Sequence, residues 1–246
     1  MYLTTKALVL RVTDYNDRDS LLTLLTDEYG KLTVKARGLR RKNSPLTAPC
    51  QLLTYAEFTL FESRGFYTIN EAVSIELFQG LRRDLTRLSL GTYFAQAAEV
   101  MAQEDMPNPE LLSLVLNCLF ALTGLGRSEE QVKAVFEFRA ACIAGYEPDL
   151  GGCHVCGDQD KLLFDLSGGA LLCERHRTQT SGIRLPVNAG TVDAMRYIAG
   201  CDSKKLFSFT VGQENLSQLA SVAEAYLTTQ LERGFSALDF YKSLLI

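Results

Sequence analysis

The residues best suited to chemistry are three cysteines and a histidine that occur as two close pairs. Cys153-x-x-Cys156 is followed, after 16 intervening residues, by Cys173-x-x-His176. Two ligands from each of two tight turns can complete a tetrahedron around one Zn²⁺, and thiolate and imidazole are ligands that zinc prefers. Glycines surround these residues, which is typical of metal-binding turns and unlike the surroundings of buried thiols. We therefore predict a zinc site formed by Cys153, Cys156, Cys173 and His176.

The predicted zinc ion is expected to be structural. A catalytic zinc ion keeps one coordination position open beside an acid or a base. Here the protein itself supplies enough ligands to close the site, and we interpret His154 as a non-ligand. Glu174 lies between two ligands but is not part of a deaminase-like His-x-Glu pattern. The remaining cysteines are interpreted as buried or idle thiols: Cys50, Cys118, Cys142 and Cys201.

A second candidate site is a basic segment in a chain whose net charge is −4. No Asp or Glu occurs between Tyr29 and Ala56. Alternation along a strand places its odd-numbered cations on one face, which the following cations extend into a loop. Such an array can track a phosphate backbone without reading base sequence, although a solvated edge strand is the simpler alternative. The predicted DNA-binding residues are Lys31, Lys35, Arg37, Arg40, Arg41 and Lys42.

Catalytic patterns are sparse in the sequence. It has neither a Gly-rich nucleotide loop ending in Lys-Ser/Thr nor a Gly-x-Ser-x-Gly element. Asp14-x-x-Asp17-x-Asp19 is a candidate Mg²⁺ site, but it falls in an expected loop between the first two strands. Aromatic residues of the same region are candidates for base stacking, and we expect only one or two to be exposed. The sequence therefore favours a binding protein over an enzyme.

The elements that must position these residues change character near residue 80. Five short strands in about 75 residues suit a small closed barrel, either an OB-fold or an SH3-like barrel. The predicted strands are Lys6–Val12, Ser20–Thr26, Lys31–Arg37, Leu52–Glu62 and Phe66–Glu76.

Helical periodicity follows Gly80. Ser128-Glu129-Glu130-Gln131 is a capping box, and Gly234 is the expected end of the helix that begins near Glu214. The predicted fold is α+β: an N-terminal five-stranded OB-fold β-barrel over residues 1–80, then a mostly helical domain over residues 81–246. The zinc finger is inserted in the helical domain at about 150–182.

The bulk composition predicts a cytoplasmic protein. The most apolar run, Leu111–Leu122, is about half of the ~20 residues that cross a bilayer. The N-terminus lacks the basic region and cleavage site of a secretory signal, and an odd number of cysteines, 7, does not suggest a disulfide framework.

Taken together, these features resemble the RecO family of bacterial recombination mediators. The family's D-Y-x-E-x-D region is similar to Asp14-Tyr15-Asn16-Asp17-Arg18-Asp19, and its G-x-x-x-x-x-A-+-G-x-R-x-x-x-S stretch is similar to Gly30–Ser44. Its barrel-to-helix junction resembles the segment from Glu71-Ala72 to Leu81-Arg82-Arg83-Asp84-Leu85, and many members carry a zinc finger where this chain has its Cys and His pairs.

The resemblance implies an OB-fold and a helical domain in a protein that binds single- and double-stranded DNA and anneals complementary strands. It implies RecR and single-strand-binding protein as partners, an indirect role in loading RecA, and a bacterial, nucleoid-associated location without membrane contact. Two alternatives stay open: a zinc-containing protein–protein adaptor without direct DNA binding, and a metal-dependent nuclease or hydrolase. The mediator hypothesis predicts that replacing Arg40 and Arg41 by Ala weakens binding to all sequences alike and flattens its salt dependence.

Overall fold

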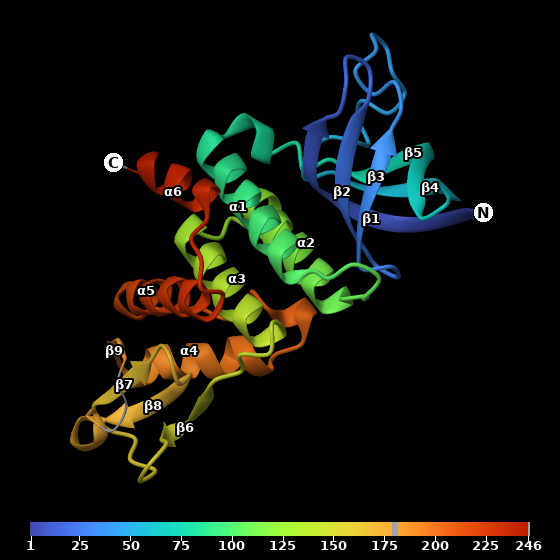
Figure 1. Ribbon diagram of the computed structural model, residues 1–246. Coiled ribbons are helices and arrows are strands. Elements are labelled where there is room, and N and C mark those ends of the chain that lie inside the picture. The colour runs from blue at the N-terminus through green and yellow to red at the C-terminus, as the bar shows by residue number, and fades with distance from the viewer. Residues whose placement is uncertain (179–181, 246) are drawn as a thin grey trace. The chain divides into compact units, whose positions relative to one another are not determined.

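The computed structural model describes residues 1–178 and 182–245 and divides into two compact units (Figure 1). The first unit comprises Met1–Thr123 and Phe235–Ile246, and the second comprises Gly124–Gly234. Within the described ranges, no helix combines the length and the apolar character needed to cross a membrane. Residues 179–181, at the end of the predicted zinc element, and Ile246, at the end of the last predicted helix, lie outside the described residues.

The first unit opens with a closed five-stranded barrel. The strand order is β1-β2-β3-β5-β4, with β1 paired to both β2 and β4. Every pairing is antiparallel except that of β3 with β5, where Val34 lies opposite Tyr67. This parallel closure is the topology of an OB-fold and confirms that prediction over the SH3-like alternative. The strands are β1 (Tyr2–Asp14), β2 (Ser20–Thr26), β3 (Lys31–Ala36), β4 (Tyr55–Ser63) and β5 (Phe66–Glu76).

Alternating side chains of the strands fill the core of the barrel. In β3, Leu32, Val34 and Ala36 are buried, while Thr33 between them faces solvent. Phe58 and Leu60 of β4 are fully buried in the same core. Since successive strand residues point to opposite faces, this packing fixes which side of β3 carries its lysines.

Three helices and a short 3₁₀ segment complete the first unit: η1 (Leu81–Arg83), α1 (Leu85–Met101), α2 (Pro109–Gly124) and α6 (Ser236–Ser243). Asp84 caps α1 by accepting hydrogen bonds from the backbone N–H groups of Thr86 and Arg87. Gly91 permits close packing, because a Cβ at this position would lie 2.9 Å from Leu53 Cδ1.

The second unit combines three helices with a small sheet. The sheet has the strand order β6-β8-β7-β9, built from β6 (Asp149–Cys153), β7 (Leu162–Asp165), β8 (Ala170–Cys173) and β9 (Arg184–Val187). Its helical elements are α3 (Glu129–Ile143), η2 (Glu174–His176), α4 (Ala189–Gly200), η3 (Ser203–Lys205) and α5 (Gln213–Gln230). Lys133 of α3 joins α3 to α5, since its ammonium group lies 2.9 Å from Glu137 and 2.7 Å from Glu224. The prediction of an α+β protein with a barrel followed by helices is confirmed.

Some predicted boundaries of helices and strands are wrong. The strand expected from Leu52 begins at Tyr55, since Leu53 adopts φ +63° and donates its N–H to Val9 O. The helix expected to end at Gly234 ends at Gln230, and Glu232 takes the left-handed conformation at φ +50°. Glycine is the usual left-handed residue at the end of a helix, so the sequence pattern favours Gly234 over Glu232 as the position where this helix stops.

Candidate nucleic-acid interface and metal centre

The side chains of Cys153, Cys156, Cys173 and His176 converge in the second unit; we call them the metal cluster. Their potential ligand atoms all lie within 4.8 Å of one another. His176 Nδ1 is 3.5 Å from Cys153 Sγ and 3.3 Å from Cys173 Sγ, and the sulfurs of Cys156 and Cys173 are 3.8 Å apart. In a tetrahedral zinc site, bonds of about 2.3 Å to sulfur and about 2.0 Å to nitrogen place two sulfurs ~3.8 Å apart and a sulfur and a nitrogen ~3.5 Å apart. The cluster therefore fits one four-coordinate metal ion.

The local backbone explains why these ligands meet. Cys153 ends β6, and its carbonyl accepts the N–H of Gly157 at 2.7 Å, which closes a tight turn around Cys156. Gly157 adopts φ +75°, a conformation that costs glycine little. Cys173 ends β8 and leads directly into η2, whose last residue is His176. An ion pair of 2.7 Å between Arg175 and Asp158 also joins the turn after Cys156 to η2.

The surroundings of Cys153 favour the thiolate that binds metals. Burial raises the pKa of this thiol, but hydrogen bonds from the backbone N–H groups of Cys173, Cys156 and Val155 outweigh it and lower the pKa to about 6. His154 is directed elsewhere, with Nδ1 2.8 Å from Asp149 Oδ2, and is not part of the cluster. The carboxylate of Glu174 lies 3.9 Å from Arg177.

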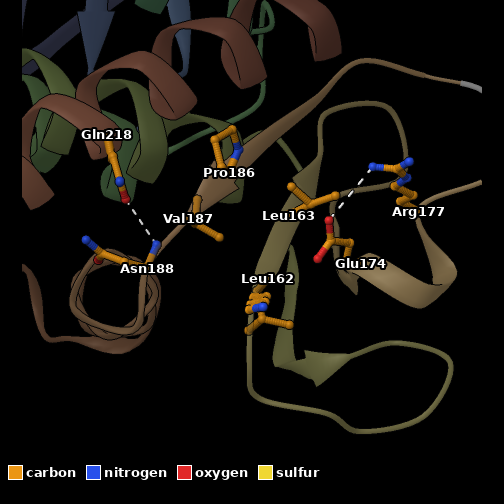
Figure 2. Close-up of a pocket in the computed structure, with 9 residues that line it drawn as sticks. Leu162, Leu163, Glu174, Arg177, Pro186, Val187, Asn188 and Gln218 are labelled. Atoms are coloured by element: carbon orange, nitrogen blue, oxygen red, sulfur yellow. Dashed lines mark hydrogen bonds and ion pairs between the residues drawn. The ribbon is translucent and has the colours of Figure 1, made fainter.

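A pocket of about 380 Å³ lies beside this element (Figure 2). Figure 2 shows an apolar floor between two polar sides, with Gln218 and Asn188 on one side and the Glu174–Arg177 ion pair on the other. The floor consists of Leu162, Leu163, Pro186 and Val187.

Three of the six predicted DNA-binding cations have bonds within the protein; we call Lys31, Lys35 and Arg40 the bonded trio. Lys31 Nζ donates to the backbone carbonyl of Glu99 at 3.0 Å. Lys35 Nζ lies 3.0 Å from an Asp19 carboxylate oxygen and 4.6 Å from the centre of the Tyr15 ring. Arg40 contacts Asp14 at 3.3 Å and donates to Asn16 O at 2.9 Å. The bonds of Lys35 and Arg40 join β3 and the loop after it to the end of β1 and the β1–β2 loop, whereas Lys31 joins β3 to α1.

The other three predicted cations extend into solvent; we call Arg37, Arg41 and Lys42 the exposed trio. All three residues are exposed in the loop that follows β3. Among the residues that the structure describes, no side chain forms an ion pair with any of the three. A phosphate group could therefore approach them without first displacing a carboxylate.

The acidic residues of the β1–β2 loop are used in protein contacts. Asp19 accepts the N–H of Gly38 at 2.8 Å, and this bond, followed by those from Lys35 and Asn16, lowers the pKa of its carboxyl group to about 2. Asp14 pairs with Arg40. Two of the three carboxylates of the candidate Mg²⁺ pattern thus already have cationic partners, which gives the nuclease alternative no support.

Comparison with known proteins gives a consistent result. The family described as Recombination protein O N terminal matches residues 1–78, and Recombination protein O C terminal matches residues 82–239. The chain is 34% identical over 245 residues to "DNA repair protein RecO" of Acetivibrio thermocellus, covering 99% of this chain and 97% of that protein. Proteins of the same name from Alkaliphilus metalliredigens (29% identity, 99% and 100% coverage) and Bacillus subtilis (28%, 90% and 86%) are also similar.

This chain belongs to the recombination protein O family. The resemblance inferred from the sequence motifs is confirmed, as is the link to DNA repair.

The sequence did not reveal which aromatic residues of the barrel are exposed. Tyr2, Tyr15, Phe61 and Phe66 have exposed fractions of 62%, 57%, 42% and 78%, more than the one or two expected. The rings of Tyr2 and Phe61 lie 5.2 Å apart on neighbouring strands. Along β4, alternation places Phe58 in the core and Phe61 on the outer face. The sequence shows this alternation only when the bounds of the strand are known.

Proposed function

We propose that this protein is a recombination mediator that binds single- and double-stranded DNA and anneals complementary strands. With RecR, it would help load RecA onto DNA covered by single-strand-binding protein. Family membership supports the repair role, and the exposed trio on an OB-fold is the observation that carries direct DNA binding. Residues 1–80 would form the DNA-binding domain, and residues 81–246 the helical domain that docks protein partners.

In this mechanism the two trios have different tasks. Lys35 and Arg40 hold β3 and the loop after it against the end of β1 and the β1–β2 loop, and Lys31 holds β3 to α1. The exposed trio is thereby presented on a fixed support. The exposed trio then neutralises phosphates without regard to base sequence. The aromatic rings on the outside of the barrel would stack on bases that are not paired, which favours single strands.

We propose that the metal cluster binds Zn²⁺ in a structural site. The distances among its sulfur and nitrogen atoms and the identity of its four ligands support this choice. When bound, the ion would cross-link β6, β8 and η2 through its ligands. All four positions would be filled by protein, so we assign the protein a binding role rather than a catalytic one.

Anisotropy of a labelled single-stranded oligonucleotide, titrated at low and moderate salt, tests the DNA-binding proposal. We expect binding that weakens steeply as salt rises, and annealing of complementary strands without ATP or Mg²⁺. An absence of binding even at low salt would overturn the proposal.

A protein–protein adaptor is the second candidate, and the pocket beside the metal cluster favours it. Its apolar floor with polar sides suits a side chain of a protein partner. Capture of RecR or single-strand-binding protein by a protein that fails to bind DNA would support this alternative. In either case we expect a bacterial cytoplasmic protein associated with the nucleoid.

A further inference from the structure

The first unit contains a pocket of about 280 Å³ that is distinct from the exposed trio; we call it the arginine pocket. One wall comes from the loop that precedes β4 and the other from the segment that joins β5 to α1. Its lining residues are Ala48, Gln51, Leu77, Gln79, Arg82 and Arg83. The lining therefore contains two cationic and two amide side chains and no carboxylate.

Arg82 is held in place at this pocket with donor groups left over. Its Nη2 donates to Leu52 O at 2.9 Å and lies 3.4 Å from Thr54 Oγ1. Its Nε and Nη1 form no hydrogen bond to any residue in the ranges 1–178 and 182–245. Although Arg82 lies at the surface, partial burial of its guanidinium group lowers its pKa. A positioned and partly desolvated guanidinium group is a strong partner for an anion.

The acidic residues nearest in sequence do not neutralise the two arginines. Asp84 accepts the N–H groups of Thr86 and Arg87 and pairs with the Arg87 side chain at 3.5 Å. Glu76 accepts the backbone N–H of Phe78 at 2.8 Å. Arg83 is exposed and has no ion pair among the described residues. The arginine pocket therefore keeps two positive charges for a ligand.

The walls of the pocket are also fixed. Leu53 and Phe78, one on each wall segment, are buried although both adopt the left-handed conformation, at φ +63° and +45°. Such conformations persist in non-glycine residues only when surrounding contacts hold them. The spacing between Gln51 and the arginines is thus set by the core rather than by mobile side chains.

We infer that the arginine pocket binds a phosphate group of a nucleic-acid backbone. Two guanidinium groups and two amides match the acceptor oxygens of phosphate, which arginine contacts through paired hydrogen bonds. The only apolar lining residues are Ala48 and Leu77, so the lining contains no aromatic ring on which the base of a mononucleotide would stack. The inference rests on the proposed DNA binding. It adds a second phosphate contact after β5, where Arg82 lies 40 residues beyond Lys42 of the exposed trio.

Arg83→Gln tests this inference, because Arg83 is exposed and its side chain bonds to no described residue. Loss of one phosphate contact lowers the slope of log Kd against log salt by about 0.7 for single strands and about 0.9 for duplex. We expect this change in Arg83→Gln, whereas Arg82→Lys keeps the charge but loses the fork of donors and should weaken binding with little change in the slope. Lys204→Gln in η3 of the second unit makes the same charge change and is expected to leave the slope unaltered.

The outcomes separate the inference from the proposed function. If the unmodified protein binds no DNA, the proposed function fails and this inference with it. If DNA binds with a salt-dependent slope that Arg83→Gln leaves unchanged and with an affinity that Arg82→Lys leaves unchanged, the pocket assignment alone is overturned. A second experiment monitors the arginine Nε–H groups by NMR during a titration with inorganic phosphate. If phosphate shifts these signals, Arg83→Gln abolishes the shift and the salt slope of DNA binding stays unchanged, the pocket is a small-anion site and does not bind the DNA backbone.

Discussion

The metal cluster and the basic segment formed by β3 and the loop after it hold their functional side chains in different ways. In the metal cluster, four side chains converge on one point, and every one of them is needed to complete the tetrahedron. Along β3 and the loop after it, the bonded trio is engaged with the protein while the exposed trio is left to solvent. Loss of one metal ligand should therefore disrupt the fold around it, whereas loss of one exposed cation should change affinity and leave the fold intact.

Removal of the metal should have the largest effect. Zinc binding contributes about 10–16 kcal/mol in isolated zinc-finger peptides, more than any single contact in this protein can supply. We expect a chelator, or Cys173→Ser, to abolish protection from hydrogen exchange in β6, β7 and β8. Cys201→Ser is the matched control, because Cys201 lies in the same unit outside the cluster. Unchanged protection after complete metal removal would contradict a structural role.

Truncation of a barrel core residue should have the next largest effect. Phe58 is fully buried, and a Phe→Ala change at such a position costs about 3–5 kcal/mol. We expect Phe58→Ala to lower the free energy of unfolding by this amount in urea denaturation. A loss below ~1 kcal/mol would show that the barrel repacks and does not hold its surface rigidly.

Replacement of an exposed aromatic residue should change DNA affinity and leave stability nearly unchanged. Phe66 has an exposed fraction of 78%, so Phe66→Ala should leave the free energy of unfolding nearly unchanged. If a base stacks on this ring, the variant should lose about 1–3 kcal/mol of binding to single-stranded DNA, as measured by anisotropy. Phe240→Ala, at an exposed position of α6, serves as the control. Equal affinities for all three proteins would remove Phe66 from the interface.

The contact between the two loops should depend on pH through Asp19. Its hydrogen bond from Gly38 and its ion pair with Lys35 lower its pKa to about 2, below the ordinary value of about 3.9. A carboxyl group with a lowered pKa stabilises the fold above its unfolded-state pKa, and this stabilisation is lost as pH falls from about 4 to about 2. We expect the stability difference between the protein and Asp19→Asn to vanish across that range. A carboxyl midpoint near 4 in an NMR titration would disprove the contact.

The sequence could predict the metal cluster because its geometry is local. Cys153 and Cys156 lie in one turn, and Cys173 and His176 in another, so their spacing nearly determines their approach. The strict alternation of β3 likewise assigns Leu32 and Val34 to the core. Family resemblance supplied the OB-fold where the strand pattern alone left two barrels open.

The engagement of individual cations could not be predicted, because it depends on contacts between residues far apart in the chain. Lys35 and Arg37 look equivalent in sequence, yet only Lys35 meets an aspartate, which the β1–β2 loop brings to it. Arg82 reaches a pocket because Leu52 O, 30 residues earlier, accepts its hydrogen bond. Which cation is engaged and which is exposed is thus a property of the folded barrel, and the composition of the segment does not reveal it.

The salt dependence of DNA binding, compared between two double variants, tests the central claim most directly. Arg41→Gln/Lys42→Gln removes two members of the exposed trio, and Lys31→Gln/Arg40→Gln makes the same charge change in the bonded trio. We predict that the first variant lowers the slope of log Kd against log salt for single strands by about 1.4, two contacts of about 0.7 each. The second should nearly retain the slope of the unmodified protein while losing thermal stability. Equal slopes for the two variants, or a larger loss in the second, would contradict the division of labour between the two trios.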